Sequence, residues 1–146
     1  MSNLESSTPP AHAAITRLIG VYDADGTVLG ELSYFVGARL GRAHCSLCVI
    51  THGAVRAKPA WTACRRELPV PFETYHRNDQ PDAVRSATGG ALPAVVAETR
   101  SGSFVRLLGP DALESCAGSL DAMLQAIGRA ATGSGLTMER TAPAEV

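Results

Sequence analysis

The sequence lacks an excess of charge of either sign. Its 13 lysines and arginines nearly balance its 14 aspartates and glutamates, which leaves a net charge of −1. Proteins that bind nucleic acid or anionic membranes through a basic surface usually carry a clear positive excess. The arginines here are scattered, and no basic run is interleaved with aromatic residues. We therefore expect neither nucleic acid nor a membrane surface as a partner.

Long apolar runs and a secretory signal are also missing. No stretch approaches the roughly 20 apolar residues of a transmembrane helix. Residues 1–10 show neither the basic region nor the apolar region of a signal peptide. We therefore expect a cytoplasmic protein, and stable structural disulfides are uncommon in that compartment.

The sequence contains none of the common motifs of nucleotide-binding or hydrolytic enzymes. There is no Gly-x-x-x-x-Gly-Lys-Ser/Thr loop and no Gly-x-Gly-x-x-Gly after a strand. A Gly-x-Ser-x-Gly elbow and a His-Glu-x-x-His pair are absent too. The pair Gly89-Gly90 therefore has no phosphate-binding context, and a nucleotide hydrolase is excluded.

What the sequence does have is the composition of an ordinary globular protein, with 45% hydrophobic and 18% charged residues over 146 positions. This length suits one domain with a core of its own. Residues 1–12 are rich in serine and proline and predict a disordered leader. Residues 13–131 form the predicted domain, and residues 132–146 a flexible tail.

Periodicity within the domain predicts an α/β fold with a central mixed sheet of about four strands flanked by helices. A helix is expected to begin at Pro59, and Gly89-Gly90 is expected to close another. Residues 100–103 predict a hairpin turn between the last two strands. The predicted strands are 15–22, 70–76, 92–98 and 104–109, and the predicted helices are 27–40, one from residue 59, 80–88 and 119–131.

The most informative pair of residues is Cys45 and Cys48, spaced Cys-x-x-Cys. Such a pair forms either a redox dithiol or half of a metal site. As a redox couple, the first thiolate attacks a substrate disulfide and the second thiol resolves the mixed disulfide. The third alternative is a non-catalytic binding module whose thiols only pack, since cysteine behaves as a small hydrophobe.

A metal site needs further ligands, because zinc prefers four nitrogen or sulfur donors. Cys45 and Cys48 have three such candidates downstream, namely His52, Cys64 and His76. With these residues the chain would hold zinc or a soft metal such as Cu(I). The spacing lacks a second close pair, so it indicates a metal less strongly than a double Cys-x-x-Cys would.

Two of these candidates, and the remaining cysteine Cys116, also have simpler interpretations. Cys64 shares a helical face with Trp61 and Leu68, which favours burial in the core over ligation. His76 ends a predicted strand, where an exposed histidine is the simpler expectation, although Asp79 is close enough in sequence to orient its ring. Cys116 is interpreted as a structural thiol.

The second half of the sequence resembles the thioredoxin-like superfamily. The run from Gly90 to Pro93 leads into a strand, a hairpin, a second strand and a terminal helix. The resemblance implies a cis peptide bond before Pro93, beside the Cys-x-x-Cys, and it leaves an extra helix at 27–40 between the first strand and Cys45. The segment around Cys45 also resembles a group of small bacterial proteins with a Cys-x-Leu-Cys motif, a likeness that implies no established function.

Together these features predict a thiol-disulfide oxidoreductase or thiol-dependent reductase. Cys45 is the expected attacking thiolate, Cys48 the resolving thiol, and Pro93 the residue lining the substrate groove. The expected substrate is a protein or small-molecule disulfide or thiol, and no cofactor is needed for this chemistry.

Overall fold

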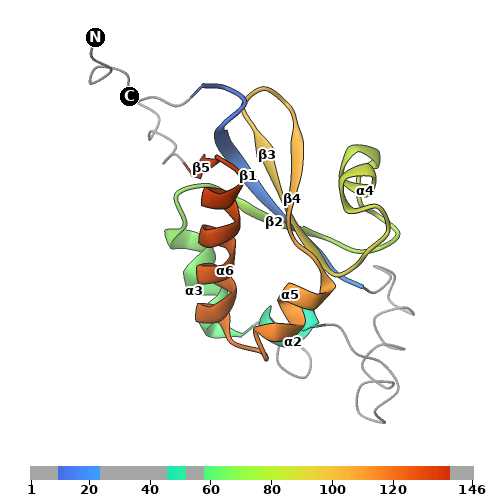
Figure 1. Ribbon diagram of the computed structural model, residues 1–146. Helices are drawn as coiled ribbons and strands as arrows, with labels where there is room; N and C mark the ends of the chain where they lie inside the picture. Colours follow the sequence, from blue (N-terminus) through green and yellow to red (C-terminus); the bar gives the residue numbers. More distant parts are fainter. Residues whose placement is uncertain (1–9, 24–45, 52–57, 139–146) are drawn as a thin grey trace.

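Strands from both halves of the chain form one mixed sheet in the computed structural model, which describes residues 10–23, 46–51 and 58–138 (Figure 1). Strand β1 (Ala14–Val21) has β2 (Phe72–Tyr75) parallel to it on one side and β3 (Ala94–Thr99) antiparallel on the other. Strand β4 (Phe104–Leu108) follows β3 as a hairpin. The strand order is β2-β1-β3-β4, so the predicted α/β fold with a mixed sheet of about four strands is confirmed at this level.

Proline sets the start of two strands. β2 begins at Phe72, two residues later than predicted, because Pro71 has no N–H to donate to a ladder. The carbonyl of Pro71 still accepts a hydrogen bond from the Leu18 N–H at 2.9 Å. β3 likewise begins after Pro93, so both strands are shorter at the start than the apolar runs that predicted them.

A bulge in β1 explains how that strand buries its side chains. Ile15 lies opposite Thr99 and Arg17 opposite Glu98, so Thr16 is an extra residue on β1. An extra residue shifts the alternation of side chains by one position. Ile15 and Leu18 therefore contact the same core cluster although they are three residues apart.

Helices cover both faces of the sheet. Helices α2 (Ser46–Thr51), α3 (Pro59–Glu67), α5 (Pro110–Ser115) and α6 (Leu120–Gly133) pack on one face. On the opposite face the described part of the chain places α4 (Asp82–Thr88) (Figure 1). The larger core cluster takes its helical members from the first face, and these include Leu47, Ile50, Trp61, Leu113, Met123 and Ile127.

Two helix ends follow their local signals. Pro59 is the first residue of α3, as predicted, and Trp61 in the first turn is 1% exposed and packs edge-on against Phe72. Gly89 ends α4 with a φ of 63°, a left-handed conformation that costs glycine little. Both helix ends could be predicted from the sequence, because the proline and the glycine that determine them lie at the ends themselves.

Three parts of the chain differ from expectation or lie outside the described residues. The short helix α5 was not predicted. In the segment expected to be a flexible tail, α6 continues to Gly133, and a two-residue strand β5 (Thr137–Met138) pairs in parallel with Ala14 and Ile15. The predicted helix at 27–40 lies outside the described residues.

Candidate functional site

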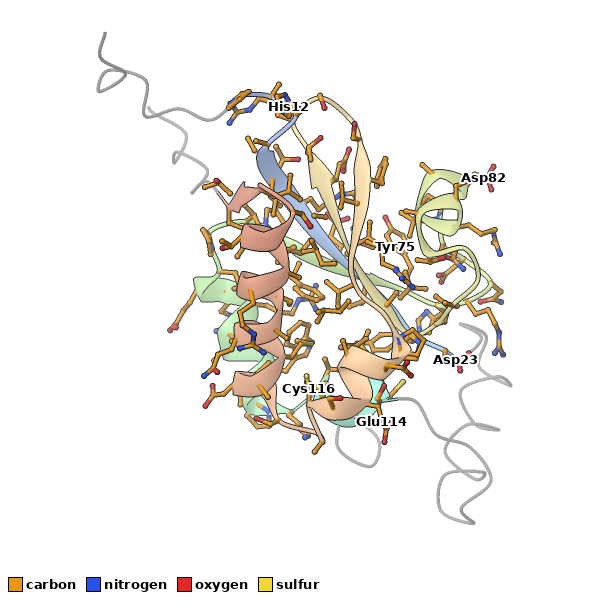
Figure 2. The ribbon with its side chains drawn as sticks, in the orientation of Figure 1. His12, Asp23, Tyr75, Asp82, Glu114 and Cys116 are labelled. Carbon is orange, nitrogen blue, oxygen red and sulfur yellow. The ribbon has the colours of Figure 1, made fainter. Side chains whose placement is uncertain are left out.

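The topology gathers strand ends at one edge of the sheet. Because β1 and β2 are parallel, both end there, and Val21 lies beside Tyr75. Because β3 is antiparallel to β1, it begins there, and Val21 also lies beside Ala94. We call this region, made by Tyr22, His76 and Pro93, the carboxyl edge of the sheet. In Figure 2, Asp23 lies at this edge, whereas His12 lies at the opposite end of the sheet.

Pro93 stands at the start of β3 in the position that the resemblance assigns to it. The Leu92–Pro93 peptide bond is cis, and Pro93 is buried. Its neighbour Ala94 pairs with Val21, the last residue of β1. Pro93 therefore directly precedes β3, next to the last residue pair that β3 forms with β1.

Helix α2 packs against the sheet through apolar side chains. Leu47 and Ile50 are both 0% exposed. Gly20 provides the room on β1, since a Cβ atom at this position would lie 3.2 Å from Leu47 Cδ2 and 3.0 Å from Phe72 Cε1. Cys48 is half-buried and packs against the same cluster. The described cysteine of the Cys-x-x-Cys pair is thus held on a helix whose apolar side is fully covered.

A buried hydroxyl pair ties α2 to the end of β1. The Tyr22 hydroxyl lies 3.0 Å from Thr51 Oγ1, and Thr51 Oγ1 donates to the Leu47 carbonyl at 3.2 Å. A threonine hydroxyl has one proton, so the Tyr22 hydroxyl is the donor to Thr51. This contact joins the carboxyl edge to the helix that carries Cys48.

His76 also lies at the carboxyl edge and is oriented by its neighbours. Its ring centroid is 5.6 Å from that of Tyr22, and its Nδ1 is 3.2 Å from Asp79 Oδ2. The Asp79 carboxylate also accepts a 2.5 Å hydrogen bond from the His76 backbone N–H. The side chain is 28% exposed, so His76 is less open to solvent than a free strand-end histidine.

A surface ion pair lies at the carboxyl edge as well. Arg77 Nη1 lies 3.1 Å from Asp23 Oδ1, and the two side chains are 50% and 37% exposed. Exposed pairs of this kind contribute little to stability, about 0–1 kcal/mol. The pair links the residues that follow β1 and β2, and the edge therefore presents both a cation and an anion to solvent.

Cys64 and Cys116 are thiols with surroundings that oppose ionisation. Burial raises the pKa of Cys64, and the carboxylates of Glu67 and Asp121 raise it further. Burial also raises the pKa of Cys116, whose Sγ donates to the Ala112 carbonyl at 3.4 Å, although Arg129 acts in the opposite direction. Cys116 is 5% exposed, which matches its interpretation as a structural thiol.

The metal-ligand candidates are only partly within the described residues. Cys45 and His52 lie outside them, whereas Cys48, Cys64 and His76 are placed on α2, on α3 and after β2. In segments 10–23, 46–51 and 58–138, no group of three histidine, cysteine, aspartate or glutamate side chains gathers with the geometry of a metal site. The three described candidates therefore do not form such a group with one another.

Sequence reasoning missed the hydroxyl pair and the ion pair at the carboxyl edge. Tyr22 and Thr51 are separated by 29 positions, and Asp23 and Arg77 by 54. A polar aromatic at the end of an apolar strand is the one local signal for Tyr22, because a buried phenol requires a hydrogen-bond partner. Nothing local identifies which hydroxyl that partner is.

Comparison of the whole chain with models of known protein families, with curated proteins and with solved structures gives no match. The helices of the described segments all fall short of the length and hydrophobicity that a bilayer span requires. The function is therefore inferred from the geometry of the carboxyl edge and from the chemistry of its residues.

Proposed function

We propose that this chain is a thiol-disulfide oxidoreductase, or a thiol-dependent reductase, with a thioredoxin-like arrangement of its sheet. The supporting observation is the convergence at the carboxyl edge, where α2 with Cys48 is tied to the end of β1 and Pro93 begins β3. The strand order β2-β1-β3-β4, with β2 parallel and β3 antiparallel to β1, is compatible with that arrangement.

The reaction would use the dithiol of Cys45 and Cys48. The Cys45 thiolate attacks one sulfur of a substrate disulfide, which breaks the S–S bond, forms a mixed disulfide and releases one substrate thiolate that takes up a proton. Cys48, as a thiolate, then attacks Cys45 Sγ and releases the second substrate thiol. The substrate gains two electrons, the protein loses two as the Cys45–Cys48 disulfide forms, and an external dithiol returns the pair to the reduced state.

The surroundings of Cys64 and Cys116 support the assignment of the reaction to Cys45 and Cys48. The thiolate is the nucleophile in disulfide exchange, so a raised pKa lowers reactivity near neutral pH. Cys64 and Cys116 both have raised pKa values. They are therefore poor competitors for a substrate disulfide, and the Cys-x-x-Cys pair is left as the reactive site.

Single serine variants test the proposal. The purified protein is reduced, freed of reductant and mixed with bis(2-hydroxyethyl) disulfide, and the products are followed by intact mass. Cys48→Ser should accumulate the mixed disulfide on Cys45, because no resolving thiol is present. Cys45→Ser should neither turn over nor trap an adduct.

Cys64→Ser is the matched control, since it removes a half-buried thiol outside the proposed pair. It should trap nothing and should form the Cys45–Cys48 disulfide at the rate of the unaltered protein. The proposal would be refuted if Cys45→Ser and Cys48→Ser both reduced bis(2-hydroxyethyl) disulfide as fast as the unaltered protein does. Co-purified zinc or Cu(I) that is released when Cys45 and Cys48 are replaced would instead support metal binding by these residues.

A further inference from the structure

Helix α2 is too short to hold its own position. It has six residues, with no acidic residue in its first turn and no basic residue in its last. Isolated helices below about 12–15 residues are marginal in water. The place of Cys48 must therefore come from tertiary contacts of α2 with the rest of the protein.

Some of those contacts are apolar and set no direction, and one is a backbone hydrogen bond from the Lys58 N–H to the Thr51 carbonyl at 2.9 Å. Leu47 and Ile50 are fully buried, but hydrophobic burial depends on area and not on orientation. The contact between Tyr22 and Thr51 is different, because a hydrogen bond has a preferred length and angle. Tyr22 is 5% exposed and Thr51 0%, so water does not compete freely for this bond.

The hydrogen bonds form a continuous series that ends next to Cys48. The Tyr22 hydroxyl donates to Thr51 Oγ1, and Thr51 donates to the Leu47 carbonyl. That carbonyl belongs to the peptide bond between Leu47 and Cys48. The two hydrogen bonds therefore span the turn of α2 that contains Cys48. They run from Thr51 back to the peptide group that precedes Cys48.

Tyr22 is itself fixed to the sheet. Its backbone N–H donates to the Tyr75 carbonyl at 2.9 Å, and its ring packs at a tilt of 44° against His76. The backbone of Tyr22 is thus bonded to β2, and its ring is held against His76 at the end of that strand. The Tyr22 side chain therefore links the carboxyl edge to α2 by a hydrogen bond.

We propose that Tyr22 is a positioning residue for Cys48, and that it acts through Thr51. This inference rests on the proposed function, because it assigns the hydroxyl pair to the step in which Cys48 attacks the mixed disulfide. Loss of the Tyr22 hydroxyl leaves the ring and its packing in place but frees the turn that holds Cys48. The resolving step slows, whereas the first attack by Cys45 does not depend on where Cys48 lies.

The test separates the two chemical steps in a single turnover. Reduced protein is mixed with bis(2-hydroxyethyl) disulfide, quenched with acid at successive times, and the mixed disulfide and the internal disulfide are quantified by intact mass. Tyr22→Phe and Thr51→Val should each slow the resolving step about five- to tenfold, the size expected for one buried hydrogen bond. The double variant should be no slower than Thr51→Val, because that substitution already removes the contact that Tyr22→Phe removes.

Two variants serve as controls. Thr51→Ser keeps the hydroxyl and should resolve within twofold of the unaltered protein. Tyr75→Phe removes a phenol from the neighbouring strand, whose ring packs in the smaller cluster on the opposite face of the sheet, and it should change neither step. Amide hydrogen exchange in α2 should become faster in Tyr22→Phe and Thr51→Val only.

Three results would count against the inference. An unchanged resolving rate in Tyr22→Phe overturns it and leaves the proposed function intact. Equal slowing of both chemical steps overturns it as well, because that pattern reports a general structural role for Tyr22. If the unaltered protein forms neither the mixed disulfide nor the Cys45–Cys48 bridge, the proposed function itself fails.

Discussion

At the scale of single residues, the thiols of Cys64 and Cys116 differ from free cysteine because burial disfavours their charged form. The pKa of each is therefore higher in the folded protein than in the unfolded chain. Between those two pKa values the folded protein binds more protons than the unfolded chain does. The stabilisation is complete below the ordinary thiol pKa of about 8.5 and is lost as pH rises through the folded values.

We therefore expect the free energy of unfolding to fall as the pH rises above about 8.5, partly because of these two thiols. In Cys64→Ala and Cys116→Ala the fall should be shallower, because an alanine side chain has no proton to lose. Urea unfolding between about pH 7.5 and 9.5 measures the slope. Equal slopes in the variants and the unaltered protein would show that the two thiols titrate alike in both states.

Arg17 is a third residue whose pKa is shifted by its surroundings. Burial lowers the pKa of its guanidinium, but hydrogen bonds and charge from Glu73 and Glu98 outweigh this and hold the pKa above its ordinary value. The guanidinium lies 2.5 Å from the Glu73 carboxylate on β2 and 2.7 Å from the Glu98 carboxylate on β3. One cation thus joins three neighbouring strands.

Replacing Arg17 by glutamine should lower the free energy of unfolding by about 1–2 kcal/mol, because two carboxylates lose their shared cation. Urea unfolding at low and high salt measures this, and salt should reduce the loss by screening the two remaining charges. Arg66→Gln on the exposed side of α3 removes the same charge and should have almost no effect. Equal losses in the two variants would contradict a specific role for Arg17.

At the scale of elements, Gly20 controls how closely α2 approaches the sheet. A Cβ atom there would lie 3.0 Å from Phe72 Cε1 and 3.2 Å from Leu47 Cδ2. Gly20→Ala should therefore destabilise the protein by about 1–3 kcal/mol, as overpacking usually does. Thermal or urea unfolding measures the change in stability.

Gly128 in the middle of α6 is the matched control, since a Cβ atom there would meet nothing within 4 Å. Gly128→Ala should stabilise the protein by about 0.5–1 kcal/mol, because alanine is the better helix former. A stabilising Gly20→Ala would mean that Leu47 and Phe72 give way easily, and that α2 is less tightly fixed than its contacts indicate.

The elements that sequence reasoning predicted are those with a signal inside their own segment. Pro59 and Gly89 mark helix ends by backbone preferences that need no partner. The short elements α5 and β5 have no comparable length or periodicity, and β5 exists only because Thr137 lies beside Ala14 at the other end of the chain. The candidate site likewise has residues with a local sequence signal and residues that depend on a distant partner.

Within the site, the Cys-x-x-Cys pair was recognisable from residue type and spacing, whereas Pro93 was singled out only by the resemblance to the thioredoxin-like superfamily. The contact of Tyr22 with Thr51 was not recognisable, because it depends on how α2 is packed over β1. His76 was expected to be exposed, with Asp79 close enough in sequence to orient its ring; the ring does lie beside Asp79, but it is also partly covered by Tyr22. The contacts of Tyr22 with Thr51 and with His76 depend on the tertiary arrangement, whereas the pair of His76 and Asp79 is local in the sequence.

At the scale of the whole molecule, the residues of the candidate site gather at one edge of the sheet. The carboxyl edge holds Tyr22, His76 and Pro93, and α2 with Cys48 is tied to it. Helix α5 packs against α2 and follows β4 directly, so α2 is held by helix and sheet together. In Figure 2, Glu114 on α5 lies at the same end of the molecule as Asp23. Under the proposed function, this is the end of the sheet that a substrate disulfide would reach.

The central claim is that Cys45 and Cys48 form a working dithiol, and one measurement tests it most directly. Protein purified without oxygen or chelators is weighed by native mass spectrometry before and after mild oxidation, and the oxidised sample is digested to map its disulfides. We expect a metal-free mass that falls by two hydrogen atoms on oxidation, with the bridge mapped to Cys45 and Cys48. A mass that carries zinc or Cu(I) released by acid, or no change on oxidation, would contradict the claim.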